Sequence, residues 1–288
     1  MRDYLIYDVF TDRAFAGNPL AVVMGADGLS TAQMQAITRE FNLSETIFVM
    51  APRERAHCAR VRIFCPTAEL PFAGHPTIGC ALHLSGGQDG DLVLEEEAGP
   101  VPVTIRDGLA EFTAPRLPVP HGPAPDPALI AQALDLAPAD LGFGGHRAAV
   151  WQGGPAFLFV PLAGLDALAR ARPIEPQWSR LTAAAGTDSA YLYTPGGPGV
   201  RARMFWPPNG EDPATGSASA LLAAQFHAAG DLAGGWTVLE LEQGVEMGRA
   251  SRITLSARLD HGRLAEIRIK GRAVQIASGR IRIPEEAK

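Results

Sequence analysis

The sequence lacks the residue patterns that mark the commonest metal and disulfide sites. Its three cysteines, Cys58, Cys65 and Cys80, are an odd number in a chain of 288 residues and form no C-x-x-C pair. That spacing fits reduced thiols in a cytoplasm better than a disulfide framework. The seven histidines form no H-x-H or H-E-x-x-H pattern, so no metal site built from protein ligands is expected.

Long apolar runs and an excess of positive charge are also missing. The best candidate for a membrane span, residues 156–168, is short and contains Pro161 and Asp166. The first eight residues carry charges where a signal peptide needs an apolar core. The net charge of −6 gives no electrostatic footprint for nucleic acid or an acidic membrane. We therefore expect a cytoplasmic protein of small-molecule chemistry, with no nucleic-acid or membrane partner.

What the sequence does contain is a strand, a polar turn and a helix start within residues 204–219. The first N–H groups of a helix have no acceptor inside the helix, and the helix dipole adds positive potential there. A carboxylate or phosphate is therefore predicted to sit on Gly216, Ser217 and Ala218. Asp212 and Ser217 would flank that ligand.

A simpler interpretation exists for each of these polar residues taken alone. Asp212 or Thr215 can cap the helix while Gly216 serves a turn. A second acid, Glu45, begins a predicted strand just after a helix–strand turn, and a lone acid there is ordinarily a solvated surface glutamate. Neither residue is assigned a function by its own surroundings in the sequence.

An internal repeat favours the functional interpretation of these residues over the simpler one. Arg60-Val-Arg-Ile-Phe-Cys-Pro66 and Arg201-Ala-Arg-Met-Phe-Trp-Pro207 share Arg-x-Arg-x-Phe-x-Pro. After a shift of one residue, Glu69-Leu-Pro-Phe-Ala-Gly-His75 aligns with Glu211-Asp-Pro-Ala-Thr-Gly-Ser217, and a helix is predicted after each. The repeat indicates two similarly folded halves, joined by the proline-rich linker at residues 115–127.

The repeat also predicts where the chemistry lies. If the halves pack about a pseudo-twofold axis, both loops and both helix N-termini face one cleft, with His75 and Ser217 at equivalent positions. Such a cleft suits a small carboxylate-bearing molecule. Proton transfer beside that carboxylate needs an acid or base within hydrogen-bond reach, and Glu45, His75 and Asp212 are the available groups.

Five motifs together resemble the phenazine-biosynthesis PhzF-like isomerases, which have the diaminopimelate-epimerase-like fold. They are Phe15-Ala-Gly-Asn-Pro19, Leu43-Ser-Glu-Thr46, Glu69-Leu-Pro-Phe-Ala-Gly-His-Pro76, Glu211-Asp-Pro-Ala-Thr-Gly-Ser217 and Gln243-Gly-Val-Glu-Met-Gly-Arg249. The resemblance runs essentially from end to end of the chain. The two loop motifs are highly specific in combination.

The resemblance implies an α+β fold of two pseudo-symmetric domains, each a curved, mainly antiparallel sheet wrapped around a central helix. The N-terminal domain is expected at residues 1–116, completed by a C-terminal strand from about 272–288, and the second domain at 117–271. The active site would lie between the domains, the assembly would be a homodimer, and no cofactor would be needed.

The resemblance also implies roles for particular residues. Glu45 would be the general base and acid that moves a proton between carbons of a cyclic or unsaturated carboxylate. His75, Asp212 and Ser217 match residues that orient the substrate, relay protons or bind polar groups.

The sequence differs from the epimerases of this fold at the positions of their two catalytic thiols. Gly74 lies where they carry one catalytic thiol, and Asp212 lies near where they carry the other. The three cysteines stand elsewhere in the sequence, so a two-thiol racemase is disfavoured. A two-base amino-acid epimerase or racemase of the same fold and a non-catalytic carboxylate-binding protein stay open as alternatives.

Overall fold

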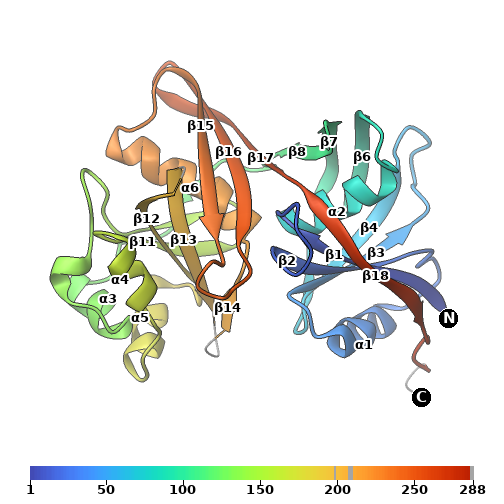
Figure 1. The fold of residues 1–288 in the computed structure, drawn as a ribbon, viewed down its shortest axis with the longest axis horizontal. Coiled ribbons are helices and arrows are strands. Elements are labelled where there is room, and N and C mark those ends of the chain that lie inside the picture. The colour runs from blue at the N-terminus through green and yellow to red at the C-terminus, as the bar shows by residue number, and fades with distance from the viewer. Residues whose placement is uncertain (198, 207–209, 286–288) are drawn as a thin grey trace. The chain divides into compact units, whose positions relative to one another are not determined.

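The computed structural model describes residues 1–197, 199–206 and 210–285. Backbone contacts divide the chain into two units (Figure 1). Unit 1 is Met1–Thr113 together with the C-terminal stretch from Lys270, and unit 2 is Ala114–Ile269. Within the described residues, none of the helices combines the length and the apolar character needed to cross a membrane.

Unit 1 alternates short strands with two helices. Its helices are α1 (Thr31–Phe41) and α2 (Gly74–Leu84). Its strands are β1 (Arg2–Val9), β2 (Asn18–Val23), β3 (Glu45–Met50), β4 (Ala59–Phe64), β5 (Glu69–Leu70), β6 (Gly90–Glu96), β7 (Gly99–Arg106), β8 (Leu109–Thr113) and β18 (Ala273–Ile281).

The strands of unit 1 pair in a mixed, mainly antiparallel order. β2 and β3 run parallel, as do β4 and β6, whereas β3–β4, β4–β5, β6–β7 and β7–β8 are antiparallel. β1 is antiparallel to β2 on one side and to the C-terminal strand β18 on the other. The end of the chain therefore completes the sheet in which the chain begins.

The central helix α2 packs against strands on all sides of unit 1, namely β1, β2, β3, β6, β7, β8 and β18. Its first eight residues are buried, so it has no polar face. Helix α1 instead begins with a capping box, in which the Ser30 and Gln33 side chains accept hydrogen bonds from each other's backbone N–H groups. It covers a second apolar cluster that includes Met34, Ile37 and Phe48.

Unit 2 has four α-helices and a 3-10 turn among its described residues. The helices are α3 (Pro127–Ala133), α4 (Leu165–Arg170), α5 (Gln177–Ala185) and α6 (Gly216–Ala229), with η1 at Pro138–Asp140. The strands are β9 (Val119–Pro120), β10 (Ala149–Gln152), β11 (Ala156–Pro161), β12 (Ala190–Gly196), β13 (Gly199–Trp206), β14 (Gly210–Asp212), β15 (Gly235–Gln243), β16 (Ser251–Asp260) and β17 (Arg263–Gly271), of which β17 ends in unit 1.

The pairing order of unit 2 repeats that of unit 1. β11–β12 and β13–β15 are parallel, and β12–β13, β13–β14 and β15–β16 are antiparallel. Each of these pairs has its counterpart in β2–β3, β4–β6, β3–β4, β4–β5 and β6–β7. The two copies of the sequence repeat thus occupy the same strand–loop–helix position in their units. Pro207, which ends the second copy, lies outside the described residues.

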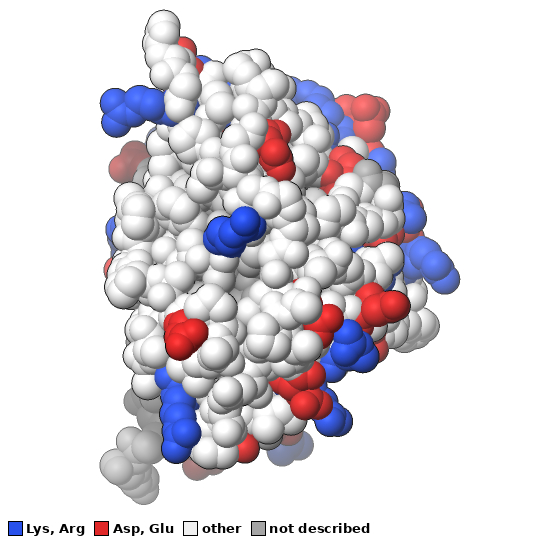
Figure 2. Space-filling model, turned by 90° about the vertical axis from the view of Figure 1, so that its left-hand side faces the viewer, with Lys and Arg blue, Asp and Glu red and all other residues white. Residues whose placement is uncertain are grey.

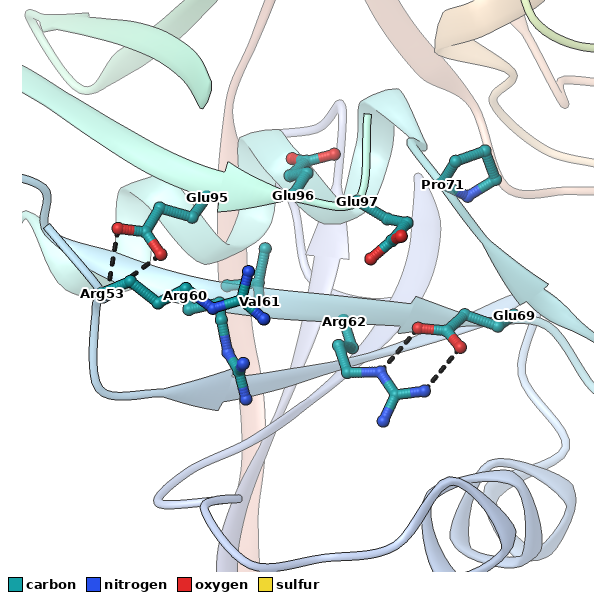
Figure 3. A pocket seen from close by; sticks show the side chains of 9 residues that line it. All are labelled: Arg53, Arg60, Val61, Arg62, Glu69, Pro71, Glu95, Glu96 and Glu97. Atoms are coloured by element: carbon teal, nitrogen blue, oxygen red, sulfur yellow. Dashed lines mark hydrogen bonds and ion pairs between the residues drawn. The ribbon is translucent and has the colours of Figure 1, made fainter. Parts of the chain in front are cut away.

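The residues shared by the two copies make the same contacts. The second arginine of each copy pairs with the glutamate of its loop, Arg62 with Glu69 and Arg203 with Glu211 (Figure 3 shows the first pair). Each guanidinium also lies over the phenylalanine two residues ahead. The repeated motif is therefore a structural unit that ties the loop to its strand.

Both central helices begin before the apolar runs at residues 77–84 and 218–229 from which a helix would be predicted, α2 at Gly74 and α6 at Gly216. Glycine, histidine and serine weaken the apolar pattern at these starts, although a helix start tolerates them. The predicted linker at 115–127 also holds a short strand, β9, which pairs with β10.

The surface carries charges of both signs. On the face drawn in Figure 2, acidic and basic side chains are interspersed among uncharged ones, and neither sign gathers into a patch among the residues described.

Candidate active site

Glu45 is the first residue of β3 and lies beside the start of α2. Its Oε2 is 3.3 Å from Nδ1 of His75, and the two side chains are 19% and 5% exposed. The neighbouring strand β2 places Leu20 opposite Glu45 in a parallel register. Glu45 is therefore not the solvated surface residue that a lone acid would suggest, because a buried imidazole contacts its carboxylate.

Asn18 also contacts His75, although the sequence motifs assigned it no role. It is fully buried, and its Nδ2 lies 3.4 Å from Nδ1 of His75. The turn before it is held by Asp8, which is also fully buried and accepts a 2.6 Å hydrogen bond from the Phe15 N–H. The motif at residues 15–19 was the available signal, but only the fold brings it to His75.

Gly17 is required in this turn. Its φ is +64°, and a Cβ added there would lie 2.3 Å from the Val9 carbonyl oxygen. We expect Gly17→Ala to lower the free energy of unfolding by about 1–3 kcal/mol, since both left-handed strain and a backbone clash oppose the methyl group. Urea unfolding measures this loss.

Gly28→Ala is the matched control for that variant. Gly28 has φ +79°, but a Cβ there meets no atom within 4 Å, so only the backbone strain remains. Equal losses of stability in the two variants would contradict the role given to the close approach at Gly17.

His75 is the second residue of α2, and its burial decides its protonation. Burial lowers the pKa of His75 to about 3, and a hydrogen bond to the Pro19 carbonyl opposes that shift only in part. The imidazole is consequently neutral at physiological pH. Its 3.3 Å contact with Glu45 is then a contact of a neutral ring rather than an ion pair.

The position of Nδ1 gives the neutral ring two alternatives. Nδ1 can donate a proton to Glu45 Oε2 at 3.3 Å, or accept a hydrogen bond from Asn18 Nδ2 at 3.4 Å, but not both at once. The two alternatives correspond to the two tautomers of the ring. A neutral imidazole with both tautomers supported can pass a proton to or from the carboxylate.

In unit 2, Asp212 ends β14 and is buried. Its Oδ2 accepts a 2.6 Å hydrogen bond from the hydroxyl of Thr215. Gln243 holds the same loop, because its amide Nε2 donates to the Asp212 carbonyl at 2.7 Å and to the Thr215 hydroxyl at 2.9 Å. The amide oxygen of Gln243 accepts from the Thr215 N–H at 3.1 Å.

These contacts exclude the simple capping interpretation of the loop. Thr215 is the N-cap residue of α6, but its side chain makes no capping hydrogen bond. Within the described part of unit 2, no acceptor is present for the N–H groups of Gly216, Ser217 and Ala218. The helix N-terminus therefore keeps the donors and the partial positive charge that attract an anion.

The two loops place equivalent residues at equivalent positions. Gly74 and Gly216 each begin the central helix of their unit, so His75 and Ser217 are each the second helical residue. Glu45 and His75 come together within unit 1, and Asp212, Gly216, Ser217 and Ala218 come together within unit 2. Each unit thus carries one set of predicted site residues.

The cysteines are unsuited to acid–base chemistry. Cys80 is fully buried inside α2, and burial, with a smaller effect of Glu96, raises the pKa of its thiol well above the usual range. Burial also raises the pKa of the Cys58 thiol. Cys65 lies 3.3 Å from the Thr67 hydroxyl at the end of β4. No cysteine stands at Gly74 or Asp212.

A cavity of about 490 Å³ opens elsewhere on unit 1. Its lining is charged and includes Arg60, Arg62, Glu69, Glu95 and Glu97 (Figure 3). Neither Glu45 nor His75 lines it, and two of its carboxylates are already engaged: Glu69 with Arg62, and Glu95 with backbone N–H groups and His57. The contact between Glu45 and His75 is therefore not part of this cavity.

Comparison with known proteins identifies the family of this chain. The model of the phenazine biosynthesis-like protein family, PhzC-PhzF, matches residues 7–279. The chain belongs to this family. The family match spans the strands and helices of both units, as the end-to-end resemblance of the motifs implied.

Relatives of this PhzF-like chain are named as isomerases. It is 45% identical to an uncharacterized isomerase of Mesorhizobium japonicum, over 97% of this chain and 98% of that protein. It is 34% identical to the trans-2,3-dihydro-3-hydroxyanthranilate isomerase of Pseudomonas aeruginosa, over 97% of this chain and 99% of that protein. The PhzF-like chain is accordingly an enzyme of the isomerase class.

The fold agrees with a crystal structure from the same family. The phenazine biosynthesis protein of the PhzF family from Bacillus anthracis superposes with a TM-score of 0.86 at 25% identity, covering 98% of this chain and 99% of that one. The predicted diaminopimelate-epimerase-like α+β fold is confirmed for this PhzF-like isomerase.

Proposed function

We propose that this PhzF-like isomerase catalyses a cofactor-independent proton shift on a small carboxylate-bearing metabolite, in a cleft between its two units. The observation that carries the proposal is the contact between Glu45 and the buried, neutral His75. The Glu45 carboxylate is the base, and it lies 3.3 Å from an imidazole that can accept or return its proton.

The proposed reaction moves one proton and two pairs of electrons. The Glu45 carboxylate takes a proton from a carbon next to a double bond, and the electron pair of the broken C–H bond becomes a new double bond. The electron pair of the existing double bond forms the new C–H bond at its far carbon, which takes the proton back from Glu45, directly or through His75. Atoms and electrons balance within the substrate, so the step needs no oxidant, reductant or second substrate.

The residues of unit 2 are proposed to hold the substrate during this transfer. The unoccupied N–H donors of Gly216, Ser217 and Ala218 suit a carboxylate, and the Ser217 side chain adds a hydroxyl. Asp212 is fixed by Thr215 and Gln243 and would orient a polar group of the substrate. Gly74 would allow the substrate to approach the backbone at the start of α2.

The substrate class follows from the relatives. The substrate named for the Pseudomonas relative is trans-2,3-dihydro-3-hydroxyanthranilate, which is a cyclic unsaturated amino carboxylate. We propose a related cyclic or unsaturated carboxylic acid for this enzyme. The homodimer and the cytoplasmic location predicted from the resemblance stay predictions, and light scattering on the purified protein tests the first.

A proton-exchange screen tests the proposed function. The enzyme is incubated in D₂O with trans-2,3-dihydro-3-hydroxyanthranilate and with a panel of cyclic and unsaturated carboxylic acids, and NMR follows the carbon-bound protons. We expect one compound to isomerise and to take up deuterium at the receiving carbon.

The alternatives have distinct outcomes in the same screen. Deuterium uptake with inversion at the α-carbon of an amino acid, detected by chiral analysis, would replace the isomerase by an epimerase. Tight binding of a carboxylate in calorimetry, with neither exchange nor product, would instead support a non-catalytic binding protein.

A further inference from the structure

Glu96 is a buried acid that the proposed reaction does not use. It is the last residue of β6 and is 8% exposed. Alternation along the strand turns its carboxyl toward α2, whereas Glu95 and Glu97 point to the opposite side, where Arg60 and Arg62 lie (Figure 3). Among the residues that the structure describes, no arginine forms an ion pair with the Glu96 carboxyl.

The hydrogen bonds around Thr77 determine the protonation of Glu96. The Thr77 hydroxyl lies 2.8 Å from the Ala73 carbonyl oxygen and 2.6 Å from Glu96 Oε1. A hydroxyl has one proton, and a carbonyl oxygen can only accept. If Glu96 is protonated, it can donate to the Thr77 oxygen while Thr77 donates to Ala73, so that each contact has its own proton; if Glu96 is ionised, the two acceptors compete for the single Thr77 proton.

The environment of Glu96 agrees with this count of protons. Burial raises the pKa of Glu96 to about 8, because the lowering that a hydrogen bond donated by Thr77 to the carboxylate would give does not offset the loss of solvation. A titratable group that faces it from α2 is Cys80, whose thiol stays protonated because burial raises its pKa. The charged neighbours on its own strand and on β4 belong to the opposite face (Figure 3).

The internal repeat gives Glu96 a counterpart in unit 2. Arg60 lies opposite Glu95 between β4 and β6, and Arg201 lies opposite Glu242 between β13 and β15. The residues that follow are Glu96 and Gln243. Gln243 is the residue whose amide binds the Asp212 carbonyl and both polar groups of Thr215. A glutamine and a protonated glutamate have nearly the same shape, and each has an acceptor oxygen beside a donor, with two N–H groups in the amide and one O–H in the acid.

We propose that Glu96 is a positioning residue that acts as a neutral acid, holding the start of α2 and with it His75, as Gln243 holds the loop of Asp212. Glu96 acts on the turn from Ala73 to Thr77, within which His75 lies. The connection of Glu96 with catalysis rests on the proposed function, whereas its effect on the start of α2 does not. The positioning role and the proposed function can therefore be tested separately.

Glu96→Gln tests the proposal, because glutamine keeps the shape and the donor of the neutral acid at every pH. The His75 imidazole is followed by NMR from pH 6 to 10 in protein labelled at histidine, its signal being assigned by its absence in His75→Gln. We expect the wild-type signal to shift with a midpoint near pH 8, although His75 itself does not titrate there. The shift should be absent in Glu96→Gln.

Glu97→Gln is the matched control. Glu97 is exposed in the turn that follows β6, and its side chain points away from that of Glu96 (Figure 3), so this variant should keep the wild-type midpoint. The same pH profile in the wild type and in Glu96→Gln would overturn the proposal, as would loss of the midpoint in Glu97→Gln.

Thermal unfolding supplies a readout that needs no assignment. The pKa of Glu96 is higher in the folded than in the unfolded protein, so its stabilising effect is complete below the unfolded pKa and is lost as pH rises to about 8. The melting temperature of Glu96→Gln should therefore rise relative to the wild type between about pH 5 and pH 8 and keep a constant lead above pH 8. A difference that does not change with pH would contradict a neutral Glu96.

Gln243→Glu tests the equivalence of the two positions. An acid at this position must be protonated to donate to the Asp212 carbonyl and would ionise next to the Asp212 carboxylate. We expect this variant to melt well below the wild type at pH 8 and to approach it at low pH. Equal melting temperatures at pH 8 would overturn the equivalence.

Activity separates this inference from the proposed function. With trans-2,3-dihydro-3-hydroxyanthranilate as the probe, kcat should fall above pH 8 in the wild type and stay level in Glu96→Gln. If the wild type does not turn over any probe but the His75 midpoint depends on Glu96, the proposed function fails and the positioning role stands. If turnover occurs and both proteins share one pH profile, the positioning role fails.

Discussion

Glu45→Gln is expected to abolish solvent-proton exchange into the substrate and to lower kcat by about 10²–10⁴-fold, the range that a positioned general base contributes. Glutamine preserves the shape of the side chain and its place at the start of β3, but its amide cannot take a proton from carbon. Because Glu45 is 19% exposed at the strand end, the fold should survive, and circular dichroism with urea unfolding checks that.

The measurement is deuterium uptake by NMR, made on the compound that the exchange screen identifies. Glu40→Gln serves as a matched control, since Glu40 is an exposed acid of the same unit near the end of α1, and it should exchange at the wild-type rate. Undiminished uptake in a folded Glu45→Gln protein would remove Glu45 from the role of base.

Arg203→Met is expected to lower the free energy of unfolding by about 3–5 kcal/mol, the loss that follows when one partner of a buried ion pair is removed. Arg203 and Glu211 are only 10% and 16% exposed. Nη1 of Arg203 also donates to the carbonyl oxygens of Leu168 and Ala171 at 2.9 and 2.8 Å. Methionine would leave a carboxylate and two buried carbonyl groups without these donors.

The internal repeat supplies the control for this variant. Arg62 makes the same pair with Glu69 in unit 1, but these side chains are 23% and 28% exposed. Solvent screens the more exposed pair, so Arg62→Met should lose about 1 kcal/mol. Urea unfolding compares the two variants, and a loss at Arg62 equal to that at Arg203 would show that burial does not set the strength of the pair.

A double variant separates the ion pair from the carbonyl contacts. Arg203→Met combined with Glu211→Met removes both charges, so the unpaired carboxylate disappears while the carbonyl groups stay unsatisfied. Part of the stability lost in Arg203→Met should therefore return. No recovery would assign the whole loss to the carbonyl contacts.

The internal repeat allowed much of the architecture to be predicted without coordinates. Arg-x-Arg-x-Phe recurs because in both units the second arginine must pair with a loop glutamate and lie over a phenylalanine. These contacts span only a few residues, so their requirements are recorded locally in the sequence. The equivalence of His75 and Ser217 followed from the same alignment and agrees with the helix starts.

Other features of the site could not be derived in this way. The proximity of Asn18 and Glu45 to His75 joins three segments that are distant in the chain, and β-sheet register decides it. The protonation of His75 and of Glu96 depends on burial, which a local pattern does not specify. The domain boundaries and the site residues inferred from the family resemblance stay predictions that the proposed variants test.

By itself, the sequence of this protein determined that two similar halves exist, that each has a loop leading into a central helix, and that the chain is PhzF-like. Only the tertiary structure decided that Asp212 receives the Thr215 hydroxyl instead of capping α6, and that Glu96 and Gln243 occupy matching places behind the two loops. The physical reason is that hydrogen bonds and desolvation depend on where distant segments meet, whereas repeats and helix signals are written in neighbouring residues.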